Sequence, residues 1–146
     1  EEVGKLLDDR GLTYKLSKPA GEQKSGLADV LLVNTTGELM NFYGASDIAY
    51  VGKSLAGQTG GHNIIEPAIY GKAILHGFHM ENFRQVEQLF KDAQASLELQ
   101  TESEFEPALK KLVEDETLRT EMGKRARGLV DRYRGAIERT LNQLEH

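Results

Sequence analysis

Short apolar runs alternate along this 146-residue chain with segments of helical periodicity, and this alternation restricts the fold more than any other feature. The apolar runs predict strands at 12–16, 29–34, 48–51, 73–76 and 96–99. The periodic segments predict helices at 2–10, 37–43, 63–70 and 81–93, another after Thr101, and a helical tail from 118 to 144 with breaks near Gly123 and Gly135. The run at 29–34 is nearly all apolar, which is typical of a strand covered on both faces. The sequence therefore predicts an α/β fold: a Rossmann-like parallel sheet with helices on both faces.

The composition excludes several functional classes. A net charge of −5 and a pI near 5.4 argue against a general nucleic-acid binder. Without cysteine the chain has no disulfide framework, no Cys-ligated zinc and no thiol nucleophile. No apolar stretch of the sequence approaches the ~20 residues that span a bilayer.

The two ends of the sequence suggest a piece of a longer protein. The chain opens on Glu1 rather than Met, and its ending Leu144-Glu145-His146 is typical of the start of a vector-derived tag. We therefore expect residues 144–146 to be a tag remnant and residues 1–143 to form one domain cut from a longer chain.

A glycine-rich segment, 52–61, joins the strand at 48–51 to the helix that begins near Asn63. Glycine allows a ligand to approach the backbone, and N–H groups at a helix start favour an anion by about 0.3–1 kcal/mol. Ligands of parallel α/β sheets lie beyond the carboxyl ends of the strands, so this segment is a candidate phosphate site. A plain strand-to-helix loop is the alternative. Glu66 follows one turn later, either as a hydrogen-bond acceptor for a ribose diol or as a surface acid favoured by the helix dipole.

Two motif-like patterns lack residues that their motifs require. Gly52-Lys53-Ser54 resembles the end of a phosphate-binding P-loop, but Asp47 stands where that motif requires its first glycine. His76 and His79 are three residues apart, but Gly77 lies between them and no third ligand is evident. We therefore expect neither a P-loop nor a metal.

Two further segments have both a structural and a functional interpretation. Thr35-Thr36-Gly37-Glu38 follows a predicted strand and is typical of a helix N-cap with an acid in the first turn, a role compatible with ligand binding. Basic residues gather in the last helices: Lys124, Arg125, Arg127, Arg132, Arg134 and Arg139. Acidic residues are interspersed among them, which favours a solvated face, with attraction to an anionic membrane surface as the alternative.

The chain resembles the 3-deoxy-D-manno-octulosonic acid (Kdo) transferases over most of its length. The likeness is carried by DVLLVNTTGELMNFYGASDIAYVGKSL, by GGHNIIEPAIYGKAILHGFHMENF, and by RYRGAIERTL near the end. The combination of GGHN-x-x-EPA with G-x-H-x-x-NF is specific to this family. The resemblance implies that residues 1–143 are the C-terminal, donor-binding half of a two-domain GT-B glycosyltransferase.

The resemblance also implies an activity. Such enzymes transfer Kdo from CMP-Kdo to a lipid A precursor in lipopolysaccharide biosynthesis, at the cytoplasmic face of the bacterial inner membrane, without a metal or other cofactor. Their acceptor site, membrane anchor and catalytic base lie in an N-terminal domain with no counterpart here. We therefore expect no catalytic residue in this chain and no sugar transfer by it alone. The first strand of the donor domain and a Pro-Arg pair that contacts CMP are expected to be missing too.

The family's donor contacts can be carried over residue by residue. Its CMP contacts match Thr36, Gly37, Glu38, Asn63, Ile64, Ile65 and Glu66, with Glu66 on the ribose hydroxyls. Gly60, Gly61 and His62 match the loop that faces the donor phosphate or the Kdo carboxylate, and Lys53, His79 and Asn82 are further candidates. Two residues depart from the family: Thr36 replaces a usual Met, and Lys53 a usual Gly.

Two other functions stay open. The chain is a candidate donor domain of another GT-B transferase or epimerase that uses a UDP-sugar, in which case UMP would bind in preference to CMP. Alternatively it is a non-catalytic nucleotide-binding or interaction module. Nucleic acid is not an expected partner under any of these hypotheses.

Overall fold

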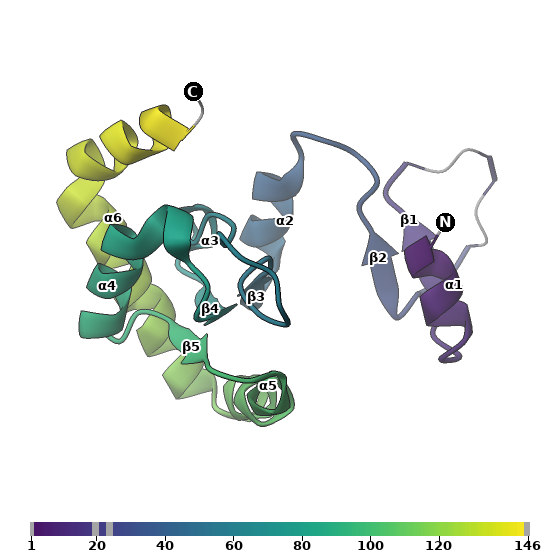
Figure 1. Cartoon of the computed structure of the whole chain (residues 1–146). Helices are drawn as coiled ribbons and strands as arrows, with labels where there is room; N and C mark the ends of the chain where they lie inside the picture. The colour runs from purple at the N-terminus through teal and green to yellow at the C-terminus, as the bar shows by residue number, and fades with distance from the viewer. Residues whose placement is uncertain (1, 19–20, 23–24, 145–146) are drawn as a thin grey trace. The chain divides into compact units, whose positions relative to one another are not determined.

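A computed structural model, which describes residues 2–18, 21–22 and 25–144, has a strand at each of the five apolar runs (Figure 1). The strands are β1 (Tyr14–Leu16), β2 (Val30–Leu32), β3 (Ile48–Val51), β4 (Ala73–Gly77) and β5 (Leu97–Leu99). Every strand pair is parallel, with Tyr14 opposite Val30 in the first ladder. The predicted parallel α/β fold is confirmed.

The strands form two sheets instead of the single sheet that was predicted. β1 pairs with β2 in one sheet, and the other has the order β3-β4-β5. The chain divides at the same place into two compact units, Glu1–Leu39 and Met40–His146. The first unit holds β1, β2 and the helix α1 (Glu2–Asp8).

The strand at β2 is not covered on both faces, so that prediction from its apolar sequence is wrong. Leu31 is 50% exposed and Val33 is 38% exposed. The strand is held at its start by Asp29, whose carboxylate accepts hydrogen bonds from the Thr13 amide (2.9 Å) and hydroxyl (2.7 Å). A two-stranded sheet in a unit of 39 residues has too little chain around it to bury both faces.

The fully buried strand is β4, in the middle of the second sheet, and all five of its residues are buried. Successive side chains of a strand point to opposite faces. Ile74 accordingly packs into one hydrophobic cluster, whereas Ala73 and Leu75 pack into another. Helices therefore cover both faces of this sheet, as predicted (Figure 1).

The helices that follow β3 pack into these two clusters. α2 (Leu39–Ala45) leads into β3; α3 (Ile65–Ile69) and α4 (Arg84–Asp92) pack with Ile74; α5 (Phe105–Glu114) packs with Leu75. Short 3₁₀ turns, Glu81–Phe83 and Glu102–Glu104, precede α4 and α5. The long α6 (Glu116–Leu144) contributes Met122 to one cluster and Ala126 to the other, so it ties both faces together.

The C-terminal helix does not break at Gly123, contrary to the sequence-based expectation. α6 continues through this residue, and a Cβ there would lie 2.0 Å from the carbonyl oxygen of Gly71. Gly123 thus serves a close backbone approach. The only non-helical backbone described within α6 is at Tyr133 (φ −108°, ψ 19°), two residues before the second predicted break at Gly135. Within the described ranges, no helix combines the length and apolarity needed to cross a bilayer.

Candidate functional site

Two loops leave the carboxyl ends of β3 and β4, which are neighbouring parallel strands. Ser54, fully buried, joins them: its hydroxyl donates to the Val51 carbonyl and accepts from the Gly77 amide, both at 2.8 Å. A Cβ on Gly77 would lie 2.0 Å from the Ser54 carbonyl oxygen, so only glycine fits there. The two loops are therefore held side by side at the edge where α/β sheets bind ligands.

The glycine pair of the first loop is clamped by the second loop. The Gly60 amide donates to Glu81 Oε2 (2.6 Å), and the Gly60 carbonyl accepts from the Asn82 amide (3.1 Å). Gly60 (φ +98°) and Gly61 (φ +67°) occupy backbone regions that favour glycine. A Cβ would lie 2.9 Å from Asn82 Nδ2 at the first position and 2.4 Å from Met80 Sδ at the second. The two predicted motifs thus form one cluster.

The loop amides that were expected to face a phosphate are used within the protein. Gly61 N–H donates to the Lys53 carbonyl (2.9 Å) and His62 N–H to the Gly52 carbonyl (3.1 Å), while Gly60 donates to Glu81. Asn63 N–H and Ile64 N–H have no hydrogen-bond partner among the described residues. Of these two residues only Asn63 is partly exposed, so its amide, at a position that the sequence had already indicated, is the one available to an anion.

The start of α3 limits what its residues can contact. Ile64 and Ile65 are fully buried, backbone included, so neither residue presents an exposed group to a ligand in this arrangement. The Ile65 amide is taken by Asn63 Oδ1 (2.9 Å). Glu66 is half-buried, and burial raises the pKa of its carboxyl while His62 opposes the shift. Burial, and then the negative charge of Glu66, raise the pKa of the Tyr43 phenol.

His79 is held on two sides. Its Nδ1 lies 3.0 Å from Glu81 Oε1, and its ring stacks on Phe78 with centroids 3.9 Å apart. The hydrogen bonds from His79 and Gly60 lower the pKa of the Glu81 carboxyl to about 2. The carboxylate is therefore ionised at neutral pH and can only accept hydrogen bonds.

Lys53 and the Thr35–Glu38 segment complete the predicted set. Lys53 is exposed, and its positive φ of 59° gives a physical reason for the glycine that the family resemblance implies at this position. Thr36 and Gly37 are exposed in the first unit, where the Thr35 hydroxyl donates to the Glu38 carboxylate. Their contact with a nucleotide stays a prediction.

The sequence interpretation missed Glu81 and a buried cluster around His76. Glu81 stands at a variable position of G-x-H-x-x-NF, so the motif gave no sign of it; a carboxylate two residues after a motif histidine was the available signal. His76 does not pair with His79. Its nitrogen lies with carboxylate oxygens of Glu87 and Glu98, all within 4.8 Å of one another.

The His76 cluster satisfies its own hydrogen bonds. Nδ1 donates to the Gly77 carbonyl (2.7 Å), which leaves Nε2 to accept from the Ser96 hydroxyl (3.0 Å). Burial lowers the pKa of His76 and, with a hydrogen bond to Glu98, raises that of Glu87 to about 7. Lys91 lies 3.1 Å from Glu98 Oε1. Glu87 thus keeps its proton to a higher pH than an ordinary carboxyl group, because its pKa is raised, whereas the pKa of Glu98, beside the Lys91 ammonium group, is lowered.

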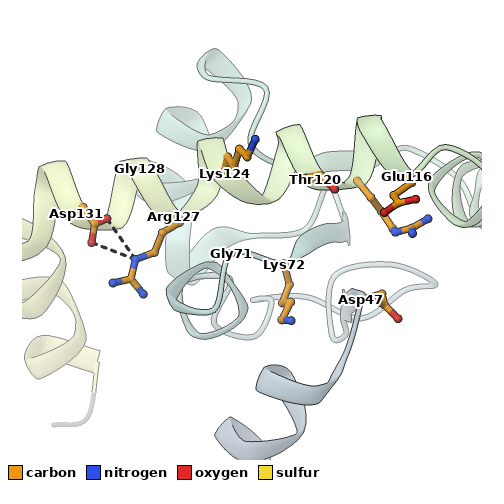
Figure 2. Close-up of a pocket in the computed structure, with 10 residues that line it drawn as sticks. Asp47, Gly71, Lys72, Glu116, Thr120, Lys124, Arg127, Gly128 and Asp131 are labelled. Atoms are coloured by element: carbon orange, nitrogen blue, oxygen red, sulfur yellow. Dashed lines mark hydrogen bonds and ion pairs between the residues drawn. The ribbon is translucent and has the colours of Figure 1, made fainter.

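A pocket of about 490 Å³ lies at the opposite edge of the sheet, beside residues that precede the strands (Figure 2). Asp47 comes just before β3, Lys72 just before β4, and α6 forms the other wall. In Figure 2, Lys124 points away from Lys72, and Arg127 is turned to Asp131 (3.1 Å). Lys72, Lys124 and Arg127 therefore do not converge on one point, and none of the residues predicted to bind the donor lines the pocket.

Three of the basic residues of α6 pair with acids on the same helix. Lys124 lies 3.2 Å from Glu121, and Arg134 lies 3.7 Å from Glu138. Together with the Arg127–Asp131 pair, this agrees with the interpretation of the cluster as a solvated face.

Comparison with known proteins gives related sequences and a related structure. The chain is 34% identical over 117 residues to 3-deoxy-D-manno-octulosonic acid transferase of Haemophilus influenzae, covering 80% of this chain and 27% of that protein. It is 33% identical over 146 residues to the enzyme of the same name from Bordetella pertussis, covering 99% of this chain and 34% of that protein. The chain therefore spans about a third or less of the length of these relatives. No family model matches it.

The structural match covers 88% of this chain and 66% of the matched chain, with a TM-score of 0.79 and 24% sequence identity. The match is to the crystal structure of the C-terminal CMP-Kdo binding domain of WaaA from Acinetobacter baumannii. The fold is thus that of the C-terminal half of a GT-B glycosyltransferase. With the sequence relationships, this shows that the chain belongs to the 3-deoxy-D-manno-octulosonic acid transferase family.

Proposed function

We propose that residues 1–143 are the donor-binding domain of a Kdo transferase and that this domain binds CMP-Kdo at the carboxyl ends of β3 and β4. The observation that carries the proposal is the clamp between the two family motifs, in which Glu81 and Asn82 hold Gly60. Residues far apart in sequence are thereby gathered at the edge of the sheet where ligands of this fold class bind.

The proposed contacts follow the chemistry of a cytidine monophosphate. The Asn63 amide, which has no partner among the described residues, suits an anionic oxygen. Glu66, partly desolvated, suits the two ribose hydroxyls, because a carboxylate accepts two hydrogen bonds. Thr36, Gly37 and Glu38 are proposed as further nucleotide contacts, on the family resemblance.

The same groups serve the proposed reaction. Negative charge grows on the phosphate of the CMP leaving group as the glycosidic bond breaks, and fixed hydrogen-bond donors and cations stabilise that charge. Lys53, His62 and His79 are proposed to contribute to this stabilisation of the leaving group. We propose that the reaction needs no metal, on the family resemblance and because the sequence contains no Asp-x-Asp motif.

For the whole protein we propose transfer of Kdo to a lipid A precursor at the cytoplasmic face of the inner membrane. The acceptor site and catalytic base are assigned to a part of the protein outside this sequence. The purified chain is accordingly expected to transfer no Kdo to a lipid A precursor, and measurable transfer would contradict this assignment.

The first experiment is a titration of the ¹⁵N-labelled chain with CMP, followed by amide chemical shifts, with UMP as the control nucleotide. CMP is expected to shift the amides of 60–66 and 36–38, and UMP is expected to shift them far less. A preference for UMP would favour a UDP-sugar enzyme instead. No response to any nucleotide would favour a non-catalytic module and contradict the proposal.

A further inference from the structure

The side chain of Glu81 joins two groups of the proposed site. One carboxylate oxygen accepts from the Gly60 amide (2.6 Å), and the other faces His79 Nδ1 (3.0 Å). Because an ionised carboxylate cannot donate, the proton of this second contact belongs to His79 Nδ1. Glu81 therefore fixes both the glycine loop and the orientation of the imidazole ring.

The rest of the His79 surroundings keeps the ring in place. Its backbone N–H donates to the Ser54 carbonyl (3.0 Å), and the Phe78 ring packs against the imidazole with the two planes tilted by 37°. Its carbonyl oxygen would lie 3.1 Å from a Cβ on Gly61, so His79 borders the glycine loop directly. Nε2 has no hydrogen-bond partner among the described residues, and the side chain is 27% exposed. One ring nitrogen is held, and the other is available.

We infer that Glu81 is a positioning residue, and that it holds His79 with Nε2 available to bind the phosphate of the donor nucleotide. This inference rests on the proposed function, and it deepens it by assigning His79 and Glu81 a role. With Glu81 on one side and a phosphate on the other, the imidazole lies between two anions. In this arrangement the ring carries a proton on each nitrogen, and it donates from Nδ1 to Glu81 and from Nε2 to the phosphate.

Two substitutions of His79 separate the two nitrogens. In His79→Asn, the amide nitrogen sits near the position of Nδ1, so the contact with Glu81 is kept while the group at Nε2 is lost. In His79→Gln, the amide reaches the position of Nε2 but loses the contact that orients the ring. We expect His79→Asn to weaken CMP binding about tenfold and His79→Gln to weaken it less.

The comparison of CMP with cytidine tests whether the phosphate is the partner. Cytidine lacks the phosphate, so its binding is expected to be the same in the parent chain and in His79→Asn. Equal losses for CMP and cytidine would mean that His79 only maintains the loop, and would overturn the inference.

Glu81→Gln tests the positioning role. An amide has a single acceptor oxygen, so it cannot accept from Gly60 and His79 through two oxygens as the carboxylate does. Long-range ¹H–¹⁵N spectra of the imidazole at alkaline pH are expected to show the Nδ1–H tautomer in the parent chain and a shift toward Nε2–H in the variant. CMP binding is expected to fall several-fold, whereas Glu102→Gln, an exposed carboxylate outside the site, leaves both readouts unchanged.

The outcomes separate a failure of this inference from a failure of the proposed function. If the parent chain binds CMP and the His79 and Glu81 variants bind it equally well, the inference fails and the proposed function stands. If the parent chain does not respond to CMP, both fail. An unchanged tautomer in Glu81→Gln would also overturn the positioning role, whatever the nucleotide does.

Discussion

Glu87 shows how a single residue acquires a property that its place in the sequence does not reveal. It lies on α4, where a glutamate is expected to face the solvent. Burial and the contact with Glu98 nevertheless raise the pKa of its carboxyl from 4.5 to about 7. A carboxyl whose pKa is raised on folding binds its proton more tightly in the native state than in the unfolded chain. Its contribution therefore becomes unfavourable as the pH rises from about 4.5 and reaches its full unfavourable value above about 7.

This gives a pH-dependent prediction for Glu87→Gln. The glutamine amide can donate to Glu98 as the protonated carboxyl does, but it does not ionise. We expect the variant to be more stable than the parent chain at pH 8 by about 1 kcal/mol, a figure reduced for solvent screening because the group is partly exposed. That corresponds to a rise in Tm of about 2–4 °C. At pH 5 the two proteins are expected to melt within a degree of each other.

Thermal melts at the two pH values measure this difference. Glu102→Gln serves as the matched control, because Glu102 is an exposed glutamate for which the same change is expected to be neutral at both pH values. An equal gain in Tm at pH 5 and pH 8 for Glu87→Gln would contradict the prediction, because the gain would then not depend on the ionisation of Glu87.

Helix α6 shows at the scale of an element how one residue type serves two purposes. Gly123 meets the Gly71 carbonyl oxygen at a distance that excludes a side chain, whereas Gly128, five residues later, has nothing within 4 Å of its would-be Cβ. Both residues are helical. At Gly128, therefore, only the difference in helix propensity between glycine and alanine determines the effect of a substitution. At Gly123 the clash of the new Cβ with the Gly71 carbonyl opposes that gain.

The two glycines predict opposite effects of alanine. Gly128→Ala is expected to stabilise the chain by about 0.5–1 kcal/mol, because alanine loses less conformational freedom in a helix. Gly123→Ala is expected to destabilise it by about 2–3 kcal/mol, since α6 must move away from Gly71 and loses packing. Chemical denaturation of the two variants measures both values, and a neutral or stabilising Gly123→Ala would contradict the close approach.

At the scale of the whole molecule, the two units differ in how much core each one has. The first unit contains two strands of three residues and one helix of seven, and its β2 is half-exposed. The second contains β4, which is buried throughout, and the two hydrophobic clusters on its faces. A two-stranded sheet is marginally stable by itself, so local opening is expected to be easier in the first unit.

Native-state hydrogen exchange tests this expectation. The ladder amides of β1 and β2 are expected to exchange at least about tenfold faster than those of β4, because their opening does not require the second core to open. Equal protection in both sheets would mean that the chain opens as one cooperative unit. Ser54→Ala would weaken β4 itself and is not a suitable probe for this comparison.

The sequence by itself determined the features that depend on local physics. Alternating apolar runs located all five strands, and the glycines at 60 and 61 correctly indicated a loop with special backbone geometry, because strand period and glycine freedom act over a few residues. The family motifs likewise identified the chain's relatives.

Only the tertiary structure decided which residues meet across long separations in sequence. It buried β4 instead of the more apolar run at 29–34, because burial depends on what packs against a strand and not on its own composition. It brought Glu81 into contact with Gly60, and it brought His76 together with Glu87 and Glu98. No local periodicity in the sequence links these positions. It also turned Gly123 from an expected helix break into a site of close contact, since the neighbour that requires a glycine there, Gly71, lies on another segment of the chain.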